Sequence, residues 1–421
     1  MKTLSVNNFS CIKSANFEMS RLTVIIGPQA SGKSVLCKLS FFMLDIAKFQ
    51  HESLLRGDSH EKCAMHIKHR FIEWFPISAW GTKRFKIEFT AGNYSLTLMR
   101  KLQQGSVADD ILVRFSTPFK QQYELLAEEI EKLTRTPNNS KNKSFSEEME
   151  VEWKIRESVN LSLKTLMGQD NVSYQAFVPA GRSFFTNIGK AIAVFEQARA
   201  LDPLVLRFGR TYTAYLERAM RTYGRKIDSA SQTAIDAALA EIFGGKHKRE
   251  NGVDLVTMTD GRKIPLTALS SGQQELLPLI TFIPWLLGDG GNDRLCYIEE
   301  PEAHLFPSSQ SKLIEALVAV TNISGCGLVM TTHSPYVLVK INNLLKAGAI
   351  SRKLREPGKK DLETIINRRA WLDVKNVSAY ALRDGKLFSI IEDDGLIDGE
   401  YLDGISEEMS TEFSNLLGLE Y

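Results

Sequence analysis

The residues that most clearly carry chemistry are Gly27, Pro28, Gln29, Ala30, Ser31, Gly32, Lys33 and Ser34, which fit the pattern G-x-x-x-x-G-K-[ST]. They follow an apolar run at 22–26, typical of a buried strand, and precede residues 34–49, whose apolar positions recur at helical spacing. In this setting the loop N–H groups and the helix N-terminus can bind phosphate. We expect Lys33 to reach the β- and γ-phosphates of ATP and the Ser34 hydroxyl to ligate Mg²⁺.

Two carboxylates, Glu299 and Glu300, end a second apolar strand that begins near Leu295. Successive strand residues point to opposite sides, so the two carboxylates can serve different purposes. We expect Glu299 to hold the Mg²⁺ shell and Glu300 to polarise the attacking water. The alternative is a strand that simply runs out into solvent.

A serine-glycine stretch at 269–275 (LSSGQQE) lies directly before an apolar helix expected at 276–287. Ser270 or Ser271, followed by Gly272 and Gln273, could present a hydroxyl and free helix N–H groups to an anion. A plain N-cap with Glu275 in the first turn explains the same residues equally well when they are taken alone.

The elements around these motifs predict an α/β fold with a parallel sheet. Strands expected at Arg294–Ile298 and Gly327–Thr331 are joined by a helix at 308–321, which makes a βαβ unit. A strand-like stretch covers 85–99, and two helices at 119–135 and 146–167 form a helical hairpin across a linker rich in Asn, Ser and Lys. Asp260-Gly261 and Asp384-Gly385 favour tight hairpin turns, and 405–418 has an amphipathic pattern.

The predicted organisation has four parts. Residues 1–50 and 253–350 form the nucleotide-binding core, and 51–170 are an insertion that contains the helical hairpin. A helical lobe spans 171–252, and a C-terminal extension spans 351–421.

The order of the motifs resembles that of the ABC ATPase superfamily: phosphate loop, serine-glycine stretch, two carboxylates, then His333 in TTHSP. The sequence IEEPEAHLFP, followed by TTHSP, resembles the corresponding motifs of the SMC-like and OLD-type heads. This group includes stand-alone AAA-type ATPase heads. The resemblance covers 1–50 and about 253–345. Transporter ATPases normally end the acidic strand with Asp and then Glu, and Glu299 departs from that pattern.

The resemblance implies a head-to-tail dimer with composite sites. Ser271 and Gly272 would contact the γ-phosphate bound by the partner chain, and His333 would sense it within its own chain. Residues 302–305 would be the D-loop that touches the other subunit. A metal-lining glutamine is also implied, for which Gln175 is the candidate, and Arg182 would either neutralise phosphate charge or pair with a carboxylate.

Composition is that of an ordinary globular protein, with a formal net charge of +2. This balance does not by itself indicate a nucleic-acid or membrane partner. The five scattered cysteines (Cys11, Cys37, Cys63, Cys296 and Cys326) are expected to be reduced packing residues. The longest apolar run, 276–287, is too short to span a bilayer, and the N-terminus lacks the apolar region of a signal peptide, so we expect a cytoplasmic protein without a membrane partner.

Three further groups are weaker candidates. His60, Cys63, His66 and His69 recur every third residue and could hold zinc, although packing explains them better because the usual ligand spacings are absent. The basic run 352–360 is expected to be a solvated loop, with contact to a phosphate backbone as the alternative. Glu392, Asp393, Asp394 and Asp398 are expected to form a polar turn rather than a nuclease site.

Three functions follow from the motifs and the resemblance. The first is the sensor ATPase of a bacterial anti-phage system, which controls a separately encoded nuclease or toxin as its partner. The second is a DNA-repair or chromosome-maintenance ATPase, with nucleic acid as a possible partner. The third is a transporter motor, against which Glu299 and the long insertion argue.

Overall fold

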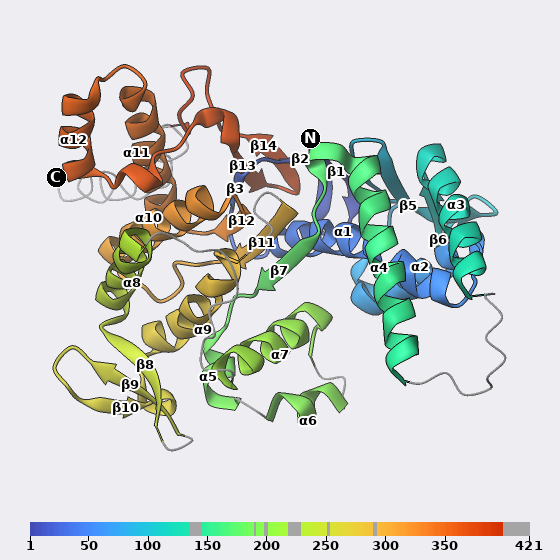
Figure 1. Ribbon diagram of the computed structural model, residues 1–421. Helices are drawn as coiled ribbons and strands as arrows, with labels where there is room; N and C mark the ends of the chain where they lie inside the picture. Colours follow the sequence, from blue (N-terminus) through green and yellow to red (C-terminus); the bar gives the residue numbers. More distant parts are fainter. Residues whose placement is uncertain are drawn as a thin grey trace, which may run out of the picture.

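The computed structural model describes residues 1–134, 145–188, 191–197, 201–217, 229–250, 253–288 and 293–398 (Figure 1). The expected α/β class is confirmed: a large mixed sheet lies between two helical layers, and a helical lobe and an inserted hairpin are attached to it. None of the helices in these ranges is long and apolar enough to cross a membrane.

The main sheet has the strand order β6-β5-β4-β1-β2-β14-β13-β3-β12-β11-β7. From β13 to β7 neighbouring strands run parallel, whereas from β2 to β6 they pair antiparallel. The parallel half places the carboxyl ends of its strands on one edge, which is where ligands bind in open α/β sheets. The bounds are β1 Lys2–Phe9, β2 Ile12–Met19, β3 Leu22–Ile26, β4 Lys86–Ala91, β5 Tyr94–Gln103, β6 Ser106–Phe115, β7 Tyr174–Val178, β11 Arg294–Glu299, β12 Gly327–Thr332, β13 Val377–Arg383 and β14 Lys386–Ser389.

The central strand β3 explains why the sheet divides the core in two. All five of its residues are buried. Ile25 packs into the cluster on one face, whereas Leu22, Val24 and Ile26 pack into the cluster on the other. A continuous apolar run therefore forms a strand that is covered on both faces, as the parallel topology requires.

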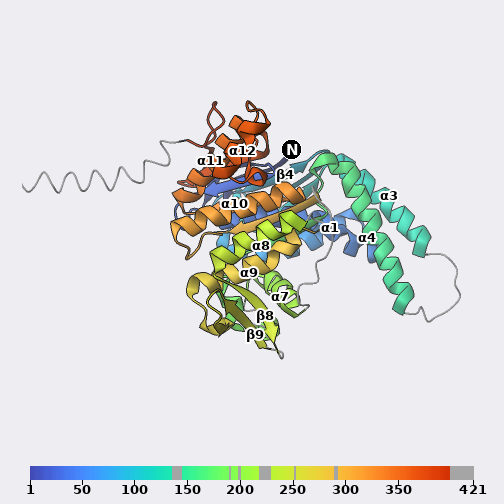
Figure 2. The same ribbon diagram turned by 60° about the vertical axis from the view of Figure 1, so that its left-hand side comes forward.

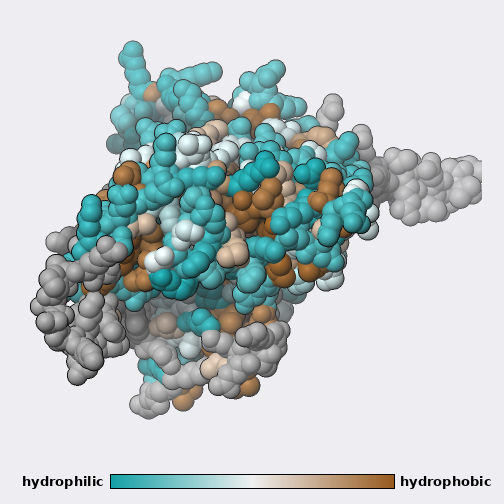
Figure 3. All heavy atoms as spheres, turned by 90° about the vertical axis from the view of Figure 1, so that its right-hand side faces the viewer, coloured by the Kyte–Doolittle hydropathy of each residue, from teal (hydrophilic) through white to brown (hydrophobic). Residues whose placement is uncertain are grey.

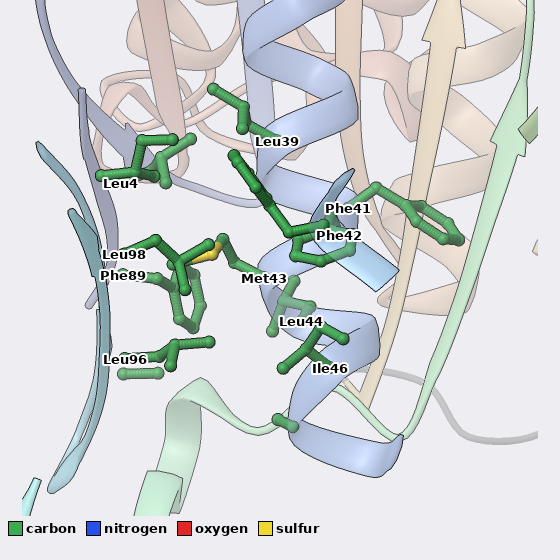
Figure 4. Close-up of a cluster of buried hydrophobic side chains, with 14 of the residues drawn as sticks. Leu4, Leu39, Phe41, Phe42, Met43, Leu44, Ile46, Phe89, Leu96 and Leu98 are labelled. Carbon is green, nitrogen blue, oxygen red and sulfur yellow. The ribbon is translucent and has the colours of Figure 1, made fainter. Parts of the chain in front are cut away.

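Helix α1 (Lys33–Leu55) covers one face and is buried along most of its length. Its Leu39, Phe42 and Met43 side chains lie toward Leu4, Phe89, Leu96 and Leu98 from the antiparallel strands (Figure 4). Phe41 turns toward the parallel strands, with its ring 5.7 Å from Tyr297 and 6.0 Å from Phe177. Helix α1 thus fixes the phosphate loop at its N-terminus against both halves of the sheet.

The inserted hairpin consists of α3 (Thr117–Thr134) and α4 (Phe145–Met167) and projects from the body of the molecule (Figure 2). Both predicted helices of this hairpin are confirmed. Figure 3 views the molecule from the hairpin's side and shows a largely hydrophilic surface with separate hydrophobic patches. Exposed apolar side chains on the hairpin are Leu125, Met149, Trp153 and Leu161.

The opposite face of the sheet carries the helical lobe and the helices that follow it in the chain. The apolar cluster there draws its side chains from these helices and from β3, β11 and β12. Beside the lobe lies a three-stranded sheet in the order β10-β9-β8. The bounds are α5 Ser183–Ile188, α6 Ile192–Gln197, α7 Pro203–Glu217, α8 Ser229–Phe243, β8 Gly245–Glu250, β9 Val253–Met258, β10 Lys263–Pro265, α9 Ser271–Leu286, α10 Pro307–Ser324, α11 Pro335–Ser351 and α12 Glu356–Ile365.

The C-terminal part of the chain contributes to the centre of the sheet. Strand β13 pairs in parallel with β3, and β14 returns antiparallel after the predicted Asp384-Gly385 turn. Residues 377–389 are therefore built into the sheet beside the strand that leads into the phosphate loop. The amphipathic segment 405–418 lies outside the described residues.

Three local predictions need correction. The stretch 85–99 is not one strand but the hairpin β4–β5, because Gly92 adopts a left-handed φ of 54° at the turn. Helix α2 (His60–Trp74) was missed, although Ser59 caps it and its buried side chains recur at helical spacing. The basic run 352–360 is not a loop throughout, because α12 begins at Glu356.

Candidate nucleotide-binding and catalytic site

The phosphate loop, residues 27–34, joins β3 to α1 and depends on close backbone contacts. A Cβ added at Gly27 would lie 2.5 Å from the Leu382 carbonyl oxygen of β13. Gly32 has a φ of 107°, and a Cβ there would lie 2.8 Å from Cys11 Sγ. Larger residues do not fit at either position, so the tertiary packing favours glycine at both.

Lys33 is the first residue of α1 and is buried. Its Nζ donates to the carbonyl oxygens of Gly27 (2.7 Å) and Pro28 (2.8 Å), and lies 3.4 Å from His333 Nδ1. Burial lowers the pKa of Lys33, and the carboxylates of Glu300 and Glu302 oppose this shift. A buried ammonium held among carbonyl oxygens is well placed for a phosphate group.

The side chains of Glu299 and Glu300 make different contacts, but strand alternation is not the cause, because β11 ends at Glu299 and Glu300 follows in a left-handed turn. Glu299 is buried, its Oε2 accepts a hydrogen bond from Ala180 N (3.2 Å), and the Ser34 side chain also hydrogen-bonds to it. Burial raises the pKa of Glu299, and these two hydrogen bonds oppose that shift. Glu300 instead has its Oε1 2.8 Å from His333 Nε2.

Glu300 is also held in an unusual backbone conformation. Its φ is 44°, a left-handed value that is uncommon outside glycine, and its N–H donates to the Thr331 carbonyl oxygen at 3.0 Å. Such strain persists where the surrounding structure enforces it, and it is frequent at functional sites. The turn directs the Glu300 side chain away from Glu299 and toward the histidine.

The donor set around Ser34 and Glu299 fits Mg²⁺. One hydroxyl and one carboxylate are hard oxygen ligands, and Mg²⁺ usually takes one or two protein carboxylates and completes its shell with substrate phosphates and water. A cation would also relieve the burial cost that raises the pKa of Glu299. Within the described residues no group of three or more His, Cys, Asp or Glu side chains could hold a metal ion without such added ligands.

Glu302 is a site residue whose contribution the sequence did not disclose. Its Oε1 accepts hydrogen bonds from Thr332 Oγ1 (2.5 Å) and from His333 N (3.0 Å), so it fixes the backbone that carries His333. Its Oε2 is buried without a hydrogen-bond partner. Glu302 lies three residues after the end of β11 at Glu299. Its carboxylate is close in space to Thr332 and His333, and only the fold shows this proximity.

The serine-glycine stretch begins α9 with a complete capping box. Ser270 is the N-cap: Gln273 N donates to its Oγ (3.4 Å), and its own N–H donates to Gln273 Oε1 (3.2 Å). Ser271 is exposed at the first helical position. A Cβ at Gly272 would lie 2.9 Å from the His304 carbonyl oxygen, so the stretch packs against residues 302–305 of the same chain.

Arg182 and Gln175 are both engaged inside the chain. Arg182 is completely buried, and its Nε lies 3.6 Å from Glu275 Oε2, so of the two predicted alternatives the structure shows a carboxylate partner. Gln175 Nε2 donates to the Phe41 carbonyl oxygen (3.0 Å). In the sheet Gln175 is level with Leu295, several residues before the carboxylate pair, so it does not line that end of the strands.

The weaker candidates resolve into ordinary contacts. Cys63 is buried in the apolar core, while His60 and His66 face carboxylates of Glu61 and Asp58, so these residues do not converge on a metal. The acidic tail residues form a turn in which Asp394 Oδ1 accepts from Leu396 N (2.9 Å). Cys11 is exposed beside the phosphate loop, contrary to the packing role expected of it, and the other four cysteines are buried.

The fold and the site together define a P-loop ATPase head of the α/β class. The profile of the AAA ATPase domain family matches residues 122–338, just over half of the chain, and the chain belongs to this family. The match contains the serine-glycine stretch, the carboxylate pair and His333. The expected ATPase family is therefore confirmed.

The SMC head domain from Thermotoga maritima is similar over 92% of this chain and 97% of its own, with 11% identity and a TM-score of 0.38. A structure of an SMC head bound to the C-winged helix domain of ScpA is similar over 95% and 98%, with 11% identity and a TM-score of 0.41. Among curated proteins none matches this sequence.

Proposed function

We propose that this chain is a cytoplasmic ATPase whose two hydrolytic sites form when two copies meet head to tail. The observation that carries the proposal is the division of the phosphate-binding groups within one chain. His333 lies within hydrogen-bond reach of both Lys33 and Glu300. Among the described residues, no hydrogen bond joins the serine-glycine stretch to the phosphate loop.

The start of α9 is an unused anion site. The N–H groups of Ser271 and Gly272 lack intrahelical partners because they belong to the first turn, and the helix dipole adds positive potential there. Ser271 is exposed, and the serine-glycine stretch packs on residues 302–305. The stretch and residues 302–305 therefore form one surface. A second chain's γ-phosphate fits this surface by charge and by donor geometry.

Within each site the residues would act as follows. Lys33 and the loop N–H groups bind the phosphates, and Ser34 with Glu299 holds Mg²⁺, which supplies charge neutralisation at the phosphates. Glu300 orients a water molecule and accepts its proton, while His333 holds the Glu300 carboxylate in place. Closing of the two chains would follow ATP binding, because only ATP offers the γ-phosphate to both.

The test is complementation between two inactive variants. Lys33→Ala lacks the phosphate lysine, and Ser271→Arg blocks the opposite surface of the site at an exposed position. In a head-to-tail dimer, a mixture of the two contains one intact site per heterodimer, so ATP hydrolysis returns on mixing. A mixture as inactive as its components, with both proteins folded, would show that each chain builds its own site.

We further propose that the closed dimer controls a separately encoded effector, a nuclease or toxin, in a bacterial anti-phage system. This rests on the resemblance to stand-alone heads of such systems. A pull-down with Glu300→Gln in the presence of ATP should capture the effector. Capture of an integral membrane protein instead would favour a transporter motor.

A nucleic-acid-dependent ATPase of the repair or chromosome-maintenance type is the second candidate, and the C-terminal helices favour it. Residues 346–375 contain nine Lys or Arg and four Asp or Glu in a chain whose net charge is +2. Lys353, Arg355 and Lys360 are exposed there. DNA should then stimulate hydrolysis in a salt-dependent way, and replacing these three residues with Ser should remove the stimulation.

A further inference from the structure

Arg182 connects two parts of the site that are far apart in sequence. Its guanidinium donates from Nη1 to the Glu299 carbonyl oxygen (2.6 Å) and from Nη2 to that of Glu300 (3.2 Å). The same side chain donates from Nε to the Glu275 carbonyl oxygen (3.1 Å) and from Nη1 to that of Pro179 (3.2 Å). One buried side chain therefore holds the backbone of α9 and the backbone of the carboxylate pair together.

The Glu275 side chain adds hydrogen bonds from α9 back to the backbone at residues 182 and 183. Its carboxylate accepts hydrogen bonds from Arg182 N (2.9 Å), Ser183 N (3.1 Å) and Ser183 Oγ (2.7 Å), in addition to the ion pair with the guanidinium. Arg182 and Glu275 are both essentially inaccessible to solvent. A buried ion pair with its hydrogen bonds made is rigid, because breaking it leaves an uncompensated charge in the interior.

The position of Glu275 gives the network its significance. Glu275 follows Ser271 by four residues, so it lies one helical turn, about 6 Å, along the same face of α9. In the proposed dimer, Ser271 and Gly272 contact the nucleotide held by the partner chain, whereas Glu300 acts on the nucleotide held by its own chain. The Arg182–Glu275 pair therefore lies on a covalent and hydrogen-bonded path between the two sites.

Glu300 is well suited to respond to a small displacement. Its left-handed φ of 44° is enforced by its surroundings, which include the Arg182 bond to its carbonyl oxygen and the Thr331 bond to its N–H. A close-packed interior transmits a shift of α9 instead of absorbing it. A change in the Glu300 backbone changes the distance from its carboxylate to His333 and to the attacking water.

We propose that Arg182 is a positioning residue that couples the two sites of the dimer, so that engagement of α9 by one nucleotide sets Glu300 for hydrolysis of the other. This inference rests on the proposed head-to-tail dimer. Coupling of this kind makes the ATPase rate depend cooperatively on ATP concentration.

Arg182→Lys is the central variant, because it keeps the buried positive charge beside Glu275 but lacks the forked donors that reach several carbonyl oxygens. We expect the wild-type Hill coefficient to approach about 2, the number of sites, and that of Arg182→Lys to fall to about 1, with a lower kcat and unchanged ATP affinity of the isolated chain. A Hill coefficient that Arg182→Lys leaves at the wild-type value would overturn the proposal.

The double variant Arg182→Met/Glu275→Met distinguishes a coupling role of Arg182 from a purely structural one. Removing both charges together avoids an unpaired buried charge, so stability should recover relative to Arg182→Met alone. We expect the double variant to remain non-cooperative even though its thermal unfolding is restored. Recovery of cooperativity along with stability would show that Arg182 only holds the fold together.

The complementation experiment separates this inference from the proposed function. If mixing Lys33→Ala with Ser271→Arg restores hydrolysis, the composite dimer stands, and a wild-type Hill coefficient of about 1 then refutes the coupling alone. If mixing restores nothing, the dimer itself fails and the coupling fails with it.

Discussion

His333 lies between Lys33 and Glu300, with its Nδ1 3.4 Å from Lys33 Nζ and its Nε2 2.8 Å from Glu300 Oε1. A lysine ammonium can only donate and a carboxylate can only accept, so the two contacts select the tautomer with the proton on Nε2. The imidazole is therefore in contact with the lysine and the carboxylate at the same time. A phosphate that draws Lys33 away from His333 would leave Nδ1 free to face the phosphate or a water molecule.

Glu300→Gln should separate hydrolysis from binding. Glutamine keeps the size of the side chain but cannot accept a proton from water, so kcat should fall by about 10²- to 10⁴-fold, the usual contribution of a general base. ATP affinity should stay near the wild-type value, and the protein should sediment as a dimer with ATP. Phosphate release and analytical ultracentrifugation measure the two effects, and retention of wild-type kcat would exclude Glu300 as the base.

Lys33→Ala should weaken ATP binding by about ten- to a hundredfold, which corresponds to the loss of one charge-assisted hydrogen bond. Thermal unfolding without nucleotide should change little, because the lost bonds to Gly27 and Pro28 are offset by removing a buried charge. Titration calorimetry with ATP and Mg²⁺ provides the measurement. ATP binding as tight as in the parent protein would show that Lys33 and its loop do not bind the phosphates.

Gly348→Ala should destabilise the protein by about 1 to 3 kcal/mol through overpacking. A Cβ at Gly348 of α11 would lie 1.8 Å from the Leu372 carbonyl oxygen, a backbone atom that cannot move aside alone. Gly358→Ala on α12 is the matched control, because its Cβ would meet only the flexible Leu354 side chain at 3.2 Å. Urea unfolding compares the two, and equal effects would contradict the close packing of α11 on the segment before β13.

Lys48→Met should change how stability depends on pH. Burial lowers the pKa of Lys48 from 10.5 to about 8, with Asp45 opposing the shift. Between these values the unfolded chain binds more protons than the folded one, so this lysine makes stability rise with pH there, whereas below about 8 the folded state bears the full cost of the buried charge. The variant's advantage over wild type should therefore be largest at pH 7 and should shrink toward pH 10.5.

Urea unfolding of both proteins at several pH values in that range tests this dependence. Lys353→Met, which removes an exposed lysine, is the control and is measured over the same pH range. A constant difference for Lys48→Met would mean that Lys48 titrates normally in the folded protein. The hydrogen bond from Lys48 Nζ to the Ser173 carbonyl oxygen (2.7 Å) is lost at every pH, so it does not affect the comparison.

Much of the local structure followed from short sequence patterns. The strand at 22–26, the phosphate loop and the helix after it were predicted from an apolar run, a glycine motif and helical spacing, because those features act over a few neighbouring residues. The α3–α4 hairpin and the Asp384-Gly385 turn were found for the same reason. The hairpin turn at Gly92 and the whole of α2 escaped because the surrounding sequence is more polar, although the buried side chains of α2 recur at helical spacing.

The sequence by itself determined which chemical groups the site contains, since Lys33, Ser34, Glu299, Glu300 and His333 stand in motifs with a local physical basis. Only the tertiary structure decided which distant groups meet: Glu302 with the backbone of His333, Glu275 with Arg182, and β13 beside β3. These contacts join segments that lie roughly thirty to several hundred residues apart, and they depend on how whole elements pack against the sheet. Packing of that kind leaves no periodic trace in the chain, so no local pattern could have disclosed it.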